Sequence, residues 1–291
     1  RVVEESRVVE ESFISADGES VQEERGVVRP AVQRYLLRRA SGVILGGAVA
    51  ASATRIGTGH QNHEHNDQPH YRNKLMSDLL THAEYQALAA DLNPPCSPFI
   101  DGKYHTGRGA VMTTTNPATG AVIAEITTAN ADDVDLAVEK AREAFDQGHW
   151  SKRDPDGRKD VLIRLCKLMT RNRRELAVME SIESGKPILD CETIDIPEAI
   201  HTIKWHAEAI DKIYDQTAPT GDDALSIIVR EPIGVAAAVL SWNFPLLMLA
   251  WKVGPALAAG CSVIVKPAEQ TSLTALRMAE LAAEAGGQPF V

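Results

Sequence analysis

The sequence lacks the signatures of several common classes of protein. No apolar run reaches the roughly 18 residues of a membrane-spanning helix, so we expect no membrane partner. Aromatic residues make up only 5% of the chain, and 40 Asp and Glu against 30 Lys and Arg leave a net charge of −10. There is no basic patch interleaved with aromatics, and an acidic chain binds a phosphate backbone poorly. We therefore expect no nucleic-acid partner.

Cysteine is also scarce, and none of the four cysteines forms a CxxC pair. A structural zinc site is not expected on that ground. A chain of 291 residues does not need disulfide bonds, and free thiols suit a reducing compartment, which predicts a cytoplasmic protein. The sequence contains neither a G-x-G-x-x-G nor a P-loop motif. The cysteines are Cys96, Cys166, Cys191 and Cys261.

The first 75 residues differ from the rest. "RVVEES" occurs twice in tandem at the start, and Glu and Ser remain dense, which predicts a disordered or extraneous extension over 1–75. Arg38–Ala53 has the composition of a secretory signal in the wrong position. The His-rich tract His60–Tyr71 could bind metal, but a solvated loop is favoured and no metal site is predicted. We expect Met76 to be the initiator and both chain ends to be cut.

Residues 76–223 contain the turn and helix-end signals of a folded domain. Short strands around turns are predicted in Phe99–Gly107 and Met112–Ile126, and a strand of an edge type, closed by proline, over Ala224–Pro232. Apolar residues at helical spacing predict the helices. These cover Asp132–Gln147, Pro155–Arg174 and Pro197–Tyr214.

The last segment, 233–291, alternates strands and helices regularly. Gly234–Trp242 and Ser262–Lys266 are predicted strands, and Leu246–Ala259 and Thr271–Ala285 are predicted helices. Apolar strands that alternate with helices form a parallel sheet with right-handed crossovers. The fold class is therefore α/β.

Polar residues follow both of these strands. In an open α/β sheet ligands bind outside the carboxyl ends of the strands, so Asn243 should lie at the same edge as Lys266 and Glu269. Lys266 and Glu269 could bind a ribose, with the carboxylate favouring NAD over NADP, or could be a solvated pair. The Asn243 amide could stabilise an oxyanion or simply cap the following helix.

The sequences of several segments resemble those of a known protein family. "EPIGVAAAVLSWNFPLLMLAWKVGPALAAGCSVIVKPAEQ" (Glu231–Gln270), with "FIDGKY", "NPATG" and "ESGKP" before it, resembles the aldehyde dehydrogenase superfamily. The segment Asp195–Tyr214 is most similar to the γ-glutamyl-γ-aminobutyraldehyde dehydrogenase branch. The resemblance runs from about Phe99 to the end. It implies a partial aldehyde dehydrogenase fold with an incomplete Rossmann-like parallel sheet.

The resemblance also implies residue roles. Asn243 matches the oxyanion-hole amide, and Ala224–Pro232 matches a strand of the oligomerisation element, which implies a homo-oligomer for the full-length parent. The cofactor-binding positions are Leu240, Ser241, Trp242, Lys266, Pro267 and Glu269, and the wall of the aldehyde tunnel is Phe244, Met248 and Trp251.

The implied reaction is NAD-dependent oxidation of an aldehyde, with an aminoaldehyde as the candidate substrate. A Cys thiolate attacks the aldehyde, hydride leaves to NAD, and a Glu-activated water releases the acid. In the family that Cys and that Glu lie downstream of the segment present here. Cys261 starts its strand about 16 Å from the ligand edge, so we expect the chain to be inactive alone. The alternative is a non-catalytic nucleotide-binding or interaction fragment.

Overall fold

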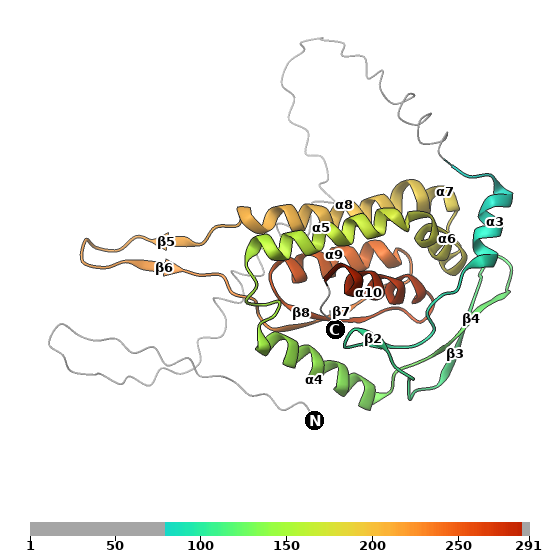
Figure 1. Ribbon diagram of the computed structural model, residues 1–291, viewed down its shortest axis with the longest axis horizontal. Coiled ribbons are helices and arrows are strands. Elements are labelled where there is room, and N and C mark those ends of the chain that lie inside the picture. The colour runs from blue at the N-terminus through green and yellow to red at the C-terminus, as the bar shows by residue number, and fades with distance from the viewer. Residues whose placement is uncertain (1–78, 287–291) are drawn as a thin grey trace, which may run out of the picture. The chain divides into compact units, whose positions relative to one another are not determined.

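The computed structural model describes residues 79–286 (Figure 1). The interpretations of 1–75, including the signal-like segment and the His-rich tract, and of Met76 lie outside the described residues. Within 79–286, none of the helices combines the length and the apolar character needed to cross a membrane.

The described part contains helices and four pairs of strands. The helices are α3 His82–Asp91, α4 Ala131–Gln147, α5 Pro155–Arg171, α6 Arg173–Ser184, α7 Ile188–Asp190, α8 Ile196–Ala209, α9 Pro245–Ala258 and α10 Leu273–Gly286, with a π-helix η1 Cys191–Asp195 and a 3-10 helix η2 Ile210–Lys212. The strands are β1 Phe99–Ile100, β2 Lys103–Tyr104, β3 Val111–Thr115, β4 Val122–Thr127, β5 Gln216–Ala218, β6 Ser226–Ile228, β7 Val235–Val239 and β8 Ser262–Lys266.

Helix α4 ends at the predicted residue, whereas α5 ends at Arg171 rather than Arg174 and α8 at Ala209 rather than Tyr214. Asn130 and Asp133 form a capping box at the start of α4, and Gly148 ends it in the left-handed conformation at φ 80°. Helix α5 begins after the Asp154 cap with proline in its first turn. The sequence did not predict α6 as a separate helix or the π-helical turn η1.

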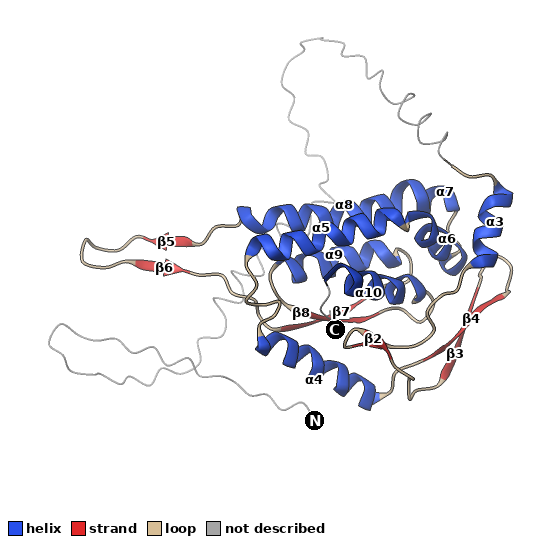
Figure 2. Ribbon diagram, in the orientation of Figure 1, coloured by secondary structure: helices blue, strands red, loops and turns tan. Residues whose placement is uncertain are grey.

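Strands β7 and β8 are parallel, which confirms the α/β prediction. Their register pairs Val235 with Ser262 and Val239 with Lys266. Helix α9 connects them and contacts both strands, while α4 contacts both from the opposite face (Figures 1 and 2). Two strands with a helix on each side form the start of a doubly wound sheet.

A single helical core supports this sheet. Helices α5, α8, α9 and α10 pack on one another through side chains that are fully buried. These include Leu162, Leu165, Met169, Ile196, Ile203, Leu246 and Leu281.

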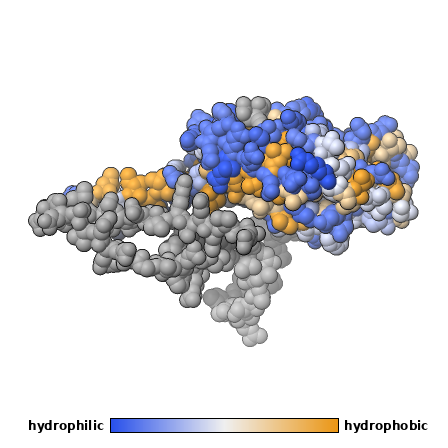
Figure 3. Space-filling view, turned by 90° about the horizontal axis from the view of Figure 1, so that it is seen from below, coloured by the Kyte–Doolittle hydropathy of each residue, from blue (hydrophilic) through white to orange (hydrophobic). Residues whose placement is uncertain are grey.

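The predicted edge strand is half of a hairpin. Strand β6 is shorter than Ala224–Pro232 and pairs antiparallel with β5, which the sequence did not predict. The hairpin extends away from the helices (Figure 1), and apolar side chains gather along it (Figure 3). Leu225, Ile227 and Val229 are 76%, 56% and 60% exposed.

Candidate functional site

The carboxyl ends of β7 and β8 meet at one edge of the sheet. The Leu240 N–H donates to the Lys266 carbonyl at 3.0 Å, which extends the ladder one residue beyond β7. The Thr271 hydroxyl donates to the Trp242 carbonyl at 3.2 Å, which ties the two following loops together. The segments that follow β7 and β8 therefore form one surface.

Lys266 and Glu269 form an ion pair on this surface, with Nζ 2.5 Å from Oε1. Both side chains are more than half exposed. The Lys266 hydrogen bond, with a backbone hydrogen bond, lowers the pKa of Glu269, so the carboxyl is an anion at neutral pH. Pro267 lies half-buried between them. The pair is preformed and open to a ligand.

Asn243 lies at the other strand end, exposed together with Ser241 and Trp242, while Leu240 is buried. Helix α9 begins at Pro245, and its N-cap residue is Phe244, whose side chain makes no capping hydrogen bond. The capping role that the sequence left open for Asn243 is therefore not observed. Its amide remains available to a ligand.

An apolar strip runs from Asn243 along α9. Phe244, Met248 and Trp251 are spaced four and three residues apart, so they share one side of the helix. Phe244 is 36% exposed, Trp251 55% exposed and Met248 half-buried. Large apolar side chains left this open are available to line a binding surface.

Helix α6 carries two buried carboxyl groups, those of Glu180 and Glu183, which accept hydrogen bonds from the helices that follow β7 and β8. They are three residues apart and therefore on one face of the helix. Glu180 Oε2 accepts the Leu246 N–H at 3.3 Å, in the first turn of α9. Glu183 accepts the N–H groups of Ser272 and Leu273, at the start of α10. The first turns of both helices are thus already bonded to carboxyl groups of this chain.

Burial raises the pKa of Glu183 to about 7, although the bonds from Ser272, Leu273 and Thr114 act in the opposite direction. The pKa of Glu180 is raised to about 8, chiefly by burial and to a smaller extent by Asp195. Desolvation outweighs the backbone donors in both cases.

Lys186 joins these groups to the apolar strip. Its ammonium pairs with Asp195 and lies 3.6 Å from the centroid of the Phe244 ring. The π-helical turn η1 turns Asp195 and Glu192 inward together, and Glu192 accepts from Arg174 and from the Tyr85 hydroxyl at 3.2 and 2.5 Å. π-Helical turns are rare and frequently occur at functional sites.

Sequence reasoning missed Glu180, Glu183, Lys186 and Asp195. The sequence held one signal, which is the helical spacing of Leu176, Glu180 and Glu183. In the structure all three side chains are buried. Acidic residues on an apolar face require partners. The partners themselves could not be found, since they lie on α9, α10 and η1.

The cysteines of 79–286 do not supply an exposed thiol at this edge. Cys166 and Cys191 are buried, and burial raises the pKa of both thiols, to about 11 for Cys166. Cys96 packs in the cluster around Ile126, and burial raises its pKa as well. Cys261 is buried and precedes Ser262, which pairs with Val235 at the opposite end of the strands from Lys266.

Comparison with known proteins identifies relatives. The model of the aldehyde dehydrogenase family matches residues 104–291. An aminoacetaldehyde dehydrogenase of Pseudomonas aeruginosa is 58% identical over 212 residues, which cover 72% of this chain and 43% of that protein. The NADP/NAD-dependent aldehyde dehydrogenase PuuC of Escherichia coli is 48% identical over 189 residues, 65% of this chain and 38% of that protein.

Solved structures agree with this result. A γ-glutamyl-γ-aminobutyraldehyde dehydrogenase from Burkholderia cenocepacia superimposes with a TM-score of 0.71 at 45% identity, over 73% of this chain and 43% of that chain. An indole-3-acetaldehyde dehydrogenase complexed with NAD+ gives 0.72 at 43% identity, over the same shares. The chain spans less than half the length of these relatives. It belongs to the aldehyde dehydrogenase family.

Proposed function

We propose that this chain supplies the adenosine-binding edge and the oxyanion amide of an enzyme that oxidises an aldehyde with NAD. The observation that carries the proposal is the shared edge of β7 and β8, where Asn243 follows one strand and Lys266 and Glu269 end the other. Family membership supports the reaction class, and the relative complexed with NAD+ supports the cofactor.

Each residue of this edge has a proposed role that follows from its chemistry. Lys266 and Glu269 donate to and accept from the ribose hydroxyls, while Leu240, Ser241, Trp242 and Pro267 border the cofactor. The Asn243 amide donates to the oxyanion that forms when a nucleophile adds to the aldehyde carbonyl. When bound at this edge, NAD would supply the acceptor for the hydride. We place the thiol outside residues 79–286, since Cys166 and Cys191 are buried, Cys96 packs around Ile126 and Cys261 lies at the far end of β8.

The substrate class that we propose is an aminoaldehyde. The names of the relatives from Pseudomonas and Burkholderia support this class, and both are more than 40% identical to this chain. Phe244, Met248 and Trp251 would contact the carbon chain of the aldehyde. Their exposure along one side of α9 fits that role.

Binding of NADH tests the cofactor assignment without requiring turnover. Lys266→Ala should weaken binding about 10- to 100-fold, because it removes charge-assisted hydrogen bonds to the ribose. Glu269→Gln should raise the affinity for NADPH relative to NADH, since it removes a charge that repels the 2′-phosphate. Titration calorimetry measures both effects.

The matched control is another exposed pair at the same spacing. Lys140 and Glu143 on α4 are 2.7 Å apart and three residues apart in sequence. Lys140→Ala and Glu143→Gln should leave NADH binding unchanged. Equal weakening by the control, or none by Lys266→Ala, would contradict the assignment.

We also propose that the β5–β6 hairpin joins copies of the protein into a homo-oligomer. Its exposed apolar side chains, Leu225, Ile227 and Val229, are unusual for a hairpin that meets only water. Ile227→Lys should shift the molar mass measured by light scattering towards the monomer. Asp222→Lys in the turn of the hairpin should not. A monomeric wild-type protein would refute the proposal.

A further inference from the structure

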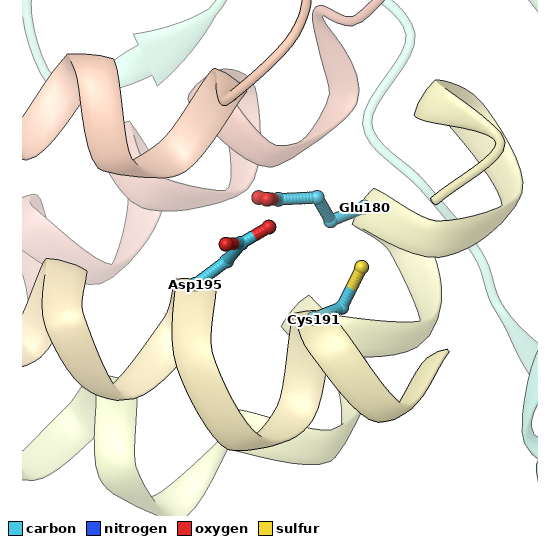
Figure 4. Close-up of side chains that lie close together, drawn as sticks. All are labelled: Glu180, Cys191 and Asp195. Atoms are coloured by element: carbon cyan, nitrogen blue, oxygen red, sulfur yellow. The ribbon is translucent and has the colours of Figure 1, made fainter. Parts of the chain in front are cut away.

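The acid pair under Phe244 has no assigned role. Carboxyl oxygens of Glu180 and Asp195 and the thiol of Cys191 all lie within 4.8 Å of one another, with the carboxyl groups directed towards each other (Figure 4). Glu180 and Asp195 are 0% and 1% exposed. Two carboxylates this close and this dry repel each other strongly. Their arrangement therefore needs a compensating charge or a proton.

Within the described residues, the cation that pairs with these acids is Lys186, and it balances one charge. Lys186 pairs with Asp195, so Asp195 is the member of the pair that carries the anion. Glu180 is left with the Leu246 N–H on Oε2, while Oε1 is buried and accepts no hydrogen bond. A proton on Oε1 removes this deficit, because the acid then donates to Asp195. Asp195 and Lys186 are the charged groups that act on Glu180, and burial adds to the effect of Asp195 in raising the pKa of Glu180.

The pair is connected to the turn between β7 and α9 at two points. Glu180 holds the first turn of α9, and Lys186 carries the link from Asp195 to the Phe244 ring. Asn243 immediately precedes Phe244, so the same groups fix the turn from both sides. We propose that Glu180 and Asp195 share one proton, and that this acid pair, closed by Lys186, positions the turn that carries Asn243 and Phe244.

Glu180 is accordingly a positioning residue and touches no substrate. The inference rests on the proposed function in one respect, which is the role assigned to the turn that carries Asn243 and Phe244. A metal ion is a poorer occupant, because an ammonium already bonds Asp195 and burial with the two acids keeps the Cys191 thiol protonated by raising its pKa. The neutral acid also explains why the pair tolerates burial next to an apolar core.

Glu180→Gln tests the shared proton, because an amide donates to Asp195 at every pH and still accepts from Leu246. Since folding raises the pKa of Glu180 from 4.5 to about 8, the folded chain binds the extra proton throughout that interval. Stability from this group is complete below about pH 4.5 and is lost as the pH rises through 8. The folding constant of E180Q relative to wild type should therefore rise about tenfold per pH unit across this window. Chemical denaturation of the chain measures it.

Amide hydrogen exchange at Leu246 tests the positioning. The Leu246 N–H should be protected in wild type and E180Q and should exchange faster in E180A, which removes the acceptor. Glu183→Gln, on the same helix but bonded to α10, should leave Leu246 protected. Neither readout requires NAD or aldehyde, so failure here is distinguishable from failure of the proposed function.

If a variant does not fold, a carbon-13 titration of the carboxyl groups of the wild type tests the protonation of Glu180 instead. The Glu180 signal, assigned by its loss in E180Q or by its proximity to Leu246, should titrate near or above neutral pH. A Glu180 that stays ionised down to about pH 5, or an E180Q whose stability tracks wild type with pH, would overturn the proposal. So would zinc that raises the melting temperature of wild type but not of E180Q.

Discussion

Glu183 allows a prediction whose sign and size follow from its surroundings. The side chain is 3% exposed, and its carboxyl group accepts the Ser272 N–H at 2.9 Å and the Leu273 N–H at 3.0 Å. The Thr114 hydroxyl approaches at 3.4 Å. Burial favours the neutral acid, whereas these donors favour the anion. Burial prevails and raises the pKa from 4.5 to about 7.

The consequence for stability follows from linkage. Because the folded value is the higher one, the folded chain holds a proton that the unfolded chain has released between 4.5 and 7. Stability from Glu183 is complete below 4.5 and is lost as the pH rises through 7. At about 1.4 kcal/mol per pH unit, this interval corresponds to about 3 kcal/mol.

Glu183→Gln removes that dependence and keeps the shape of the side chain. We expect its unfolding free energy to match wild type near pH 4.5 and to exceed it by up to about 3 kcal/mol above pH 7. Urea denaturation at a series of pH values gives the difference. Glu175→Gln, a more exposed charge change on the same helix, removes one of the two acidic partners of Arg277 and controls for net charge.

The opposite result would refute the reasoning. If E183Q is the less stable protein at neutral pH and the deficit grows with pH, then the backbone donors outweigh desolvation at this site. Glu183→Ala separates the two effects. It leaves buried N–H groups at the start of α10 without an acceptor and should cost about 1–3 kcal/mol for each one at every pH.

Two further changes test the turns and the candidate oxyanion site. Gly185 adopts φ 75°, and a Cβ there would lie 2.7 Å from Pro117, whereas Gly120 at φ 73° has open space around it. Gly185→Ala should therefore destabilise the chain more than the roughly 1–2 kcal/mol expected for Gly120→Ala, as measured by thermal unfolding, and equal costs would exclude the clash. In a form of the protein that turns over aldehyde, Asn243→Ala should lower kcat about 10²- to 10³-fold, and an unchanged kcat would remove Asn243 from its proposed role.

The sequence by itself determined the elements that depend on local chemistry. Asn130 and Gly148 bound α4 through a capping box and a left-handed residue, both of which require only neighbouring residues. The alternation of strands and helices after residue 233 predicted the parallel pairing of β7 with β8. That pairing brings Asn243 and Lys266 to one edge of the sheet.

Only the tertiary structure decided the support beneath that edge. Glu180 and Glu183 find their partners 66 and 89 residues further along the chain, and no local pattern specifies contacts at such separations. The inward turn of Asp195 depends on a π-helical turn, which has no sequence signature of its own. Burial, which raises the pKa of Glu180 to about 8 and that of Glu183 to about 7, arises only when α6, α9 and α10 pack together and exclude water.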